Sequence, residues 1–101
     1  MNIKDILPVL RDWLKEIRIP CQILADSDES LRVIFETGNA LAELIAGDGK
    51  FAPYRHVAFT VLDVRLEPTA GPVFCFYDDS THTLDDILRE LDRGIRCVAE
   101  L

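Results

Sequence analysis

The stretch from Asp78 to Asp86 holds the densest set of side chains that could do chemistry. It contains four aspartates and one histidine within nine residues. Carboxylate and imidazole groups bind divalent metals, and paired aspartates can hold each other's pKa values apart for acid and base roles. The sequence therefore offers four candidate metal ligands, namely Asp78, Asp79, His82 and Asp86.

The same cluster has a structural explanation, which we favour. Asp85 and Asp86 would occupy the first turn of a helix, where the helix dipole stabilises negative charge. Asp78 and Asp79 would begin the turn that leads from a strand into that helix. We expect His82 to be exposed in this turn. We therefore assign no catalytic residue and expect no cofactor, and a small metal-dependent enzyme centred on this cluster is the alternative.

A cysteine nucleophile would need a thiol beside His56 and an orienting carboxylate such as Asp63. The chain has three cysteines, an odd number with no CxxC pair, and each lies among apolar neighbours. This usage is typical of a reducing compartment rather than of a disulfide framework. We expect Cys21, Cys75 and Cys97 to be buried, small and unreactive.

Charge limits the kinds of partner. The 101 residues carry 18 acidic and 11 basic side chains, a net charge of −7, and the cations are spread along the chain. Such a balance disfavours nucleic acid, because phosphate backbones are also negative. Residues 20–49 hold six acids and one base, and residues 76–88 hold four acids and no base. Acidic surfaces of this kind favour a cationic protein partner and raise association rates.

One short run mixes the residue types found at protein interfaces. The segment from Phe51 to His56 includes aromatic, cationic and imidazole side chains. Aromatic residues and arginine are enriched at interface hot spots. The candidate interface residues are Phe51, Tyr54, Arg55, His56 and also Trp13. For Trp13 a place in the core is the stronger expectation, and for Phe51 and Tyr54 the alternative is that they cover a sheet edge.

Two helices are predicted from apolar spacing. The first carries a stripe from Ile6 to Ile17, is expected to begin at an N-cap on Asp5, and must stop before Pro20. The second is expected to begin at Thr83, where Asp86 completes a capping box, and to end at Gly94. Residues 95–101 could then add a short strand or prolong the helix.

Strands are predicted between the helices. Residues 21–25 and 31–36 form a hairpin across an acidic turn, and residues 56–66 and 73–77 form a second hairpin across a proline-rich loop. Residues 39–46 fit either a short helix or a strand paired with residues 31–36. The second hairpin is apolar on both sides of the β alternation, which predicts strands in the middle of a covered sheet.

These elements predict one α+β domain over residues 1–101, with a mainly antiparallel sheet of four or five strands and two amphipathic helices packed on it. The arrangement is loosely similar to type III secretion chaperones and to some bacterial immunity proteins, which are also small, acidic and cytoplasmic. The resemblance is architectural and rests on no shared motif. It implies a non-enzymatic binding protein.

We therefore expect a protein-interaction module of adaptor, chaperone or inhibitor type, with a homodimer as a further option. The first ten residues lack the long apolar segment of a signal peptide, and no apolar stretch approaches the roughly 20 residues that span a bilayer. The expected location is the cytoplasm, away from membranes.

Overall fold

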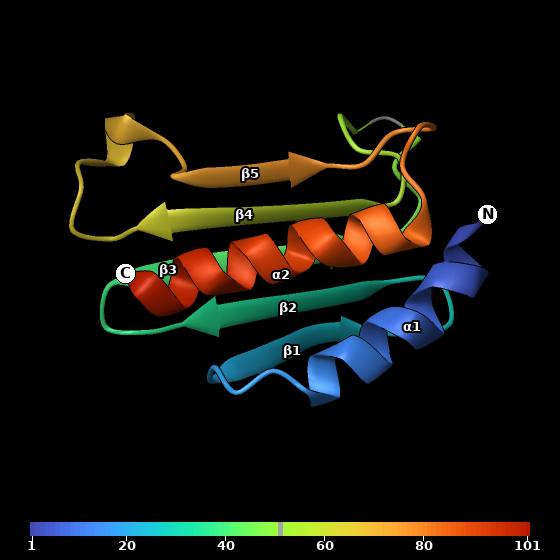
Figure 1. Cartoon of the computed structure of the whole chain (residues 1–101), viewed down its shortest axis with the longest axis horizontal. Coiled ribbons are helices and arrows are strands. Elements are labelled where there is room, and N and C mark those ends of the chain that lie inside the picture. Colours follow the sequence, from blue (N-terminus) through green and yellow to red (C-terminus); the bar gives the residue numbers. More distant parts are fainter. Residues whose placement is uncertain (51) are drawn as a thin grey trace.

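A computed structural model describes residues 1–50 and 52–101 as a five-stranded antiparallel sheet with two helices (Figure 1). The strands follow one another across the sheet in chain order, β1-β2-β3-β4-β5. This confirms the predicted α+β class. The elements are α1 (Ile3–Lys15), β1 (Cys21–Asp26), β2 (Leu31–Glu36), β3 (Ala40–Ala46), β4 (Val57–Asp63), the 3₁₀ turn η1 (Pro68–Ala70), β5 (Phe74–Tyr77) and α2 (Leu84–Glu100).

The undecided stretch 39–46 is a strand. It pairs with β2 from Leu31↔Ala46 to Glu36↔Leu41, and with β4 from Ala40↔Asp63 to Ala46↔Val57. The β2–β3 turn is closed by Thr37, whose amide donates to the Ala40 carbonyl at 2.9 Å. Small alanines alternate with larger residues along this strand, which suits a position beneath a helix.

Helix α1 begins earlier than predicted. Asn2 is the N-cap: its side chain accepts from the Lys4 amide at 2.9 Å, and the Asp5 carboxylate accepts from the Asn2 amide at 3.1 Å. The prediction of an Asp5 cap was wrong because Asp5 is the acidic partner three residues inside a capping box. The helix ends at Lys15, where Glu16 and Ile17 bond to carbonyls three residues back and tighten the last turn.

Helix α2 begins at the predicted N-cap, Thr83, and the capping box with Asp86 is complete. It does not end at Gly94 but continues to Glu100, so residues 95–100 prolong the helix. The glycine serves close packing instead of termination. A Cβ atom at Gly94 would lie 2.5 Å from two ring carbons of Phe59, which is closer than atoms can approach.

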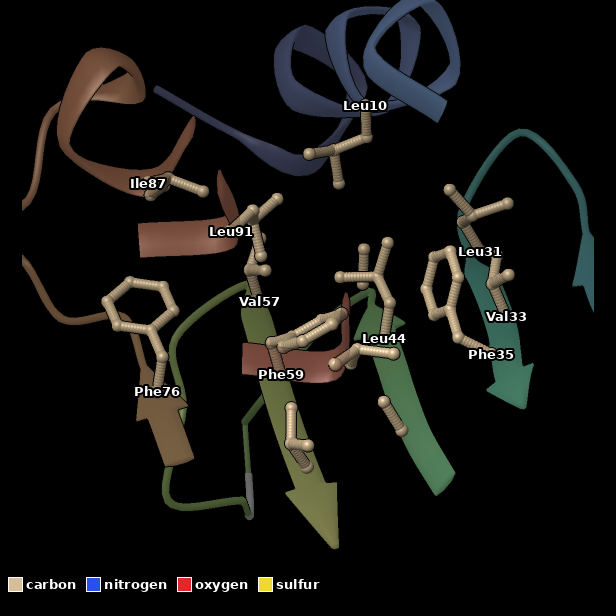
Figure 2. Close-up of a cluster of buried hydrophobic side chains, with 14 of the residues drawn as sticks. Leu10, Leu31, Val33, Phe35, Leu44, Val57, Phe59, Phe76, Ile87 and Leu91 are labelled. Carbon is tan, nitrogen blue, oxygen red and sulfur yellow. The ribbon is translucent and has the colours of Figure 1, made fainter. Parts of the chain in front are cut away.

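Both helices lie on the same face of the sheet (Figure 1). α2 packs against β3, β4 and β5, and α1 lies over the side of the sheet that holds β1 and β2. The side chains between these layers form the core, in which Phe35 and Phe59 have ring centroids 5.8 Å apart (Figure 2). None of the described helices is both long enough and apolar enough to traverse a lipid bilayer.

The expected position of the second hairpin is partly wrong. β4 is an inner strand, but β5 is an edge strand, and Val73 and Tyr77 are 43% and 45% exposed. The two helices cover one face of the sheet, so apolar side chains on the other face stay at the surface. Apolar residues on both sides of a strand therefore indicate that both faces of the sheet favour burial. They do not show that this chain itself covers both faces.

Candidate interaction face

We name the side of the sheet away from the helices the open face. Its members alternate along each strand with the buried residues of the core. From β1, Gln22 and Ala25 lie across from Ile34 and Arg32, with a bulge between Ile23 and Ala25. The open face consists of Gln22, Ala25, Arg32, Ile34, Glu36, Leu41, Glu43, Ile45, Ala58, Thr60, Leu62, Cys75 and Tyr77.

Apolar side chains dominate the open face. Leu41 and Leu62 are direct cross-strand partners and are 36% and 39% exposed. Ile45 lies next to Ala58, and Ala58 next to Tyr77, in a second row across the sheet. A shallow hollow of about 250 Å³ is lined by Ile34, Leu41, Ala42, Glu43, Thr60 and Leu62. Exposed apolar surface of this kind is common at the interaction sites of soluble proteins.

The charges within the open face compensate each other. Arg32 donates from Nε to Glu43 Oε2 at 2.7 Å, and its Nη2 atom lies 2.6 Å from the same oxygen. Glu36 lies further along β2, toward the β2–β3 turn. Near the β5 edge the surface is polar but uncharged, with Thr60 Oγ1 4.0 Å from Cys75 Sγ. The neighbouring Cys75 raises the pKa of the Tyr77 hydroxyl. The centre of the face is therefore close to neutral.

Asp78 acts as a buried clamp. It is 2% exposed, and its Oδ1 atom accepts hydrogen bonds from the amides of Arg55, His56 and Val57 at 2.9, 2.7 and 2.8 Å. These bonds join the end of β5 to the segment that leads into β4. A carboxylate that accepts three amide hydrogens is committed to holding the backbone.

The other predicted metal ligands also bond to nearby groups of their own segment. Asp79 Oδ1 accepts from the Thr81 amide at 2.8 Å and from its hydroxyl at 2.5 Å, and these bonds lower the pKa of Asp79. Hydrogen bonds from Thr83 similarly lower the pKa of Asp86. His82 is half-buried rather than exposed: its Nδ1 accepts from the Asp79 amide at 2.9 Å.

The ring of His82 stands edge-on to Phe76 at 5.2 Å, which keeps it against the sheet. Asp79 and His82 therefore share one turn, whereas Asp78 and Asp86 serve other local structures. Within residues 1–50 and 52–101 there is no group of three or more histidine, cysteine, aspartate or glutamate side chains placed to hold a metal ion.

The acidic turns lie at one end of the sheet, which we name the acidic end. The β1–β2 turn, the β3–β4 connection and the β5–α2 connection all lie at the end that also holds the N-terminus of α1 (Figure 1). Antiparallel strands joined in chain order place alternate turns at the same end. The acidic end carries Asp5, Asp26, Asp28, Glu29, Asp48, Asp79, Asp85 and Asp86 at or near these turns.

The predicted interface residues do not form one surface. Tyr54 is half-buried beside Tyr77, with ring centroids 6.4 Å apart, and so extends the open face. Arg55 is exposed, whereas both ring nitrogens of His56 are buried and have no hydrogen-bond partner among the described residues. Trp13 lies on the helix side, where its ring contacts Phe35 and its Nε1 donates to Asp92 at 2.9 Å. Phe51 lies outside the described residues.

The predicted burial of the cysteines was wrong. Cys21 and Cys75 are exposed and Cys97 is half-buried, where burial raises the pKa of its thiol. Both exposed cysteines lie on edge strands, β1 and β5, where one side of the strand has no neighbour. The apolar neighbours of Cys75, Phe74 and Phe76, belong to the covered face, and adjacent residues in a strand point to opposite faces. Cys21 lies across from Phe35 on the helix side, at the outer edge of the sheet.

Sequence reasoning missed the leucines and isoleucines of the open face. Leu41 and Ile45 fall in the stretch that fitted both a helix and a strand, and the helix alternative hid their common side. A strand assignment would have placed both of them opposite the small alanines of β3. Comparison with protein-family models, with curated proteins and with solved structures finds no match for this chain.

Proposed function

We propose that this chain is a non-enzymatic protein-interaction module, of adaptor, chaperone or inhibitor type, that binds a protein through the open face of its sheet. The observation that carries the proposal is the exposure of Leu41, Leu62 and Tyr77 on the side opposite the helices, where each is more than a third exposed. Burial of apolar surface is the main driving force of protein association, at about 25 cal/mol per Å².

The carboxylates of the acidic end support selection of a positively charged partner. These carboxylates lie around turns and are held at the surface, so they act at a distance on an approaching chain. They would speed the association of a cationic partner, and added salt would slow it. Apolar burial on the open face would supply most of the affinity.

The test compares cations added on the open face with a cation added elsewhere on the surface. The double variant Leu41→Lys/Leu62→Lys puts two cations on the open face, where apolar contact is proposed. The control is Leu66→Lys, because Leu66 is 47% exposed in the loop after β4 and outside the open face. Circular dichroism and thermal unfolding establish that each variant is folded.

A tagged bait of each form is expressed in its native cells beside an untagged copy, and bound proteins are quantified by mass spectrometry. We expect a protein, either a different chain or the untagged copy, to be recovered with the wild type and with Leu66→Lys but lost at least tenfold with the double variant. Recovery of the same proteins by the double variant would refute the proposed function.

A further inference from the structure

We propose that the open face is covered by a second copy of this chain, in a two-fold, face-to-face dimer with the layers helix, sheet, sheet and helix. This inference rests on the proposed function and names its partner. Two sheets that pack in this way lie about 10 Å apart, with their inner side chains interdigitated. Each helical layer then faces water, and the apolar rows of the two sheets bury each other.

The size of the open face suits a weak but specific dimer. With strands about 4.8 Å apart and a rise of about 3.3 Å per residue, a five-stranded sheet of this length presents a projected area of roughly 400 Å². A standard interface covers about 800 Å² of accessible surface on each partner, and corrugated side chains present more accessible than projected area. We therefore expect a dissociation constant in the micromolar range.

The charges of the open face are complementary to themselves. On β2, Arg32 and Glu36 lie two residues either side of Ile34. A two-fold axis that crosses the strands at Ile34 makes the facing β2 strands run in opposite directions. Arg32 of each copy then lies across from Glu36 of the other, and the two acidic ends point apart. An isologous interface forms each such contact twice.

The same axis also places apolar residues of the two copies opposite each other. The row that crosses the sheet from Ile34 continues through Glu43 and Thr60. On β3, Leu41 and Ile45 lie on either side of Glu43. Leu41 of each copy therefore faces Ile45 of the other copy. Glu43 lies near the axis and pairs with Arg32 of its own chain, so each Arg32 would lie between Glu43 of its own chain and Glu36 of the second copy. The open face carries one excess negative charge, fewer than the acidic end offers to a cationic partner.

The first measurement is mass against concentration. Sedimentation equilibrium from about 5 to 500 µM should show the wild type rising from its 11.4 kDa monomer mass toward twice that value. Leu62→Lys should weaken dimerisation at least about 100-fold, because each dimer loses two apolar contacts and gains two buried charges. Leu66→Lys should dimerise as the wild type does. A wild type that stays monomeric, or a Leu62→Lys dimer of unchanged affinity, overturns the inference.

The second measurement tests the two-fold arrangement. Arg32→Glu and Glu36→Arg should each weaken the dimer at least about tenfold, because each places like charges opposite one another twice. The double variant should restore the affinity to within about threefold of the wild type. Within one strand these residues lie about 13 Å apart, which is too far for them to pair with each other. Glu43 lies on the adjacent strand between them, so repeating the comparison in a Glu43→Gln background excludes rescue through Glu43 inside a single chain. A double variant as weak as its parents overturns the arrangement.

Cysteine alkylation provides a readout that needs no substitution. Cys75 lies on the open face, and Cys21 lies on the opposite edge strand, and both are exposed in the single chain. Raising the protein concentration through the dimer range should slow maleimide modification of Cys75 at least fivefold and leave Cys21 unchanged. Equal rates at all concentrations count against the dimer.

These outcomes separate the inference from the proposed function. A monomeric wild type that still recovers a different protein through Leu41 and Leu62 overturns the dimer and leaves the function in place. A monomer that recovers no protein through this face overturns both.

Discussion

The two faces of the sheet are both apolar in sequence, yet only one of them is covered. On β4, Phe59 and Val61 are fully buried beneath α2, while Leu62, the next residue, is 39% exposed on the other side. The two helices account for this difference, because both lie on the same face of the sheet (Figure 1) and Phe59 packs against Gly94 of α2 on that face. The apolar pattern of a strand thus indicates which of its faces favour burial. How many of those faces are covered within one chain depends on the helices that the chain supplies.

The largest expected effect compares matched truncations on the two faces of β4. Phe59→Ala should reduce the free energy of unfolding by about 3–5 kcal/mol, because it leaves a cavity between the sheet and α2. Leu62→Ala should cost less than about 1 kcal/mol in dilute solution, because its side chain is already partly in water. Urea denaturation at a protein concentration below the dimer range measures both. Equal losses would contradict a covered and an open face.

The next effect separates two aspartates that are adjacent in sequence. Asp78→Ala should cost about 2–4 kcal/mol, because three amides lose a buried acceptor. Asp79→Ala should cost much less, since its carboxylate bonds to an exposed turn. Asp78→Asn keeps one acceptor oxygen and should fall between them. Thermal unfolding ranks the three variants, and a larger loss for Asp79→Ala would refute the clamp.

Gly94 tests how closely α2 packs on the covered face. Alanine normally stabilises a helix interior by about 1 kcal/mol relative to glycine. Here the added Cβ would meet the Phe59 ring at 2.5 Å, so Gly94→Ala should instead destabilise the protein by about 1–3 kcal/mol. In a Phe59→Leu background the same change should cost less, because the closest contact is removed, although the Phe74 ring, 3.0 Å from the added Cβ, remains. Urea denaturation of the four proteins gives the coupling directly.

Local signals in the sequence predicted local structure well. The Thr83 capping box, both hairpins and the antiparallel α+β class follow from residues that lie close together in the chain. The start of α1 was misplaced because Asn2 and Asp5 are both good cap residues, and only their reciprocal bonds show which one is the cap.

Features that depend on distant contacts could not be predicted in this way. The role of Gly94 is set by Phe59 in β4, and the exposure of Cys75 is set by the edge position of β5. The candidate site followed the same rule. Tyr54, selected from its residue type, lies beside Tyr77, but the leucines of the open face share a surface only once the strand register is known.

The smallest expected effect concerns acid at the exposed end of the molecule. Hydrogen bonds from Thr83 hold the pKa of Asp86 below its ordinary value, and those from Thr81 do the same for Asp79. A carboxyl whose pKa is lower when folded stabilises the folded state at pH values above its unfolded pKa. That contribution is lost as the pH falls through the folded pKa, so stability should decline below about pH 4.

Asp86→Asn should therefore flatten the dependence of the thermal midpoint on pH between about pH 5 and pH 2. Asp85→Asn is the matched control, because it removes a carboxylate from the same helical turn and leaves the capping box intact. The Asp86 variant should also be less stable than the control at pH 7, where the wild-type carboxylate is ionised. An equally steep acid limb in the Asp86 variant would show that the capping box is not the source of acid sensitivity. The decline would then have to come from other carboxyls with a lowered pKa, such as Asp79, which accepts hydrogen bonds from Thr81.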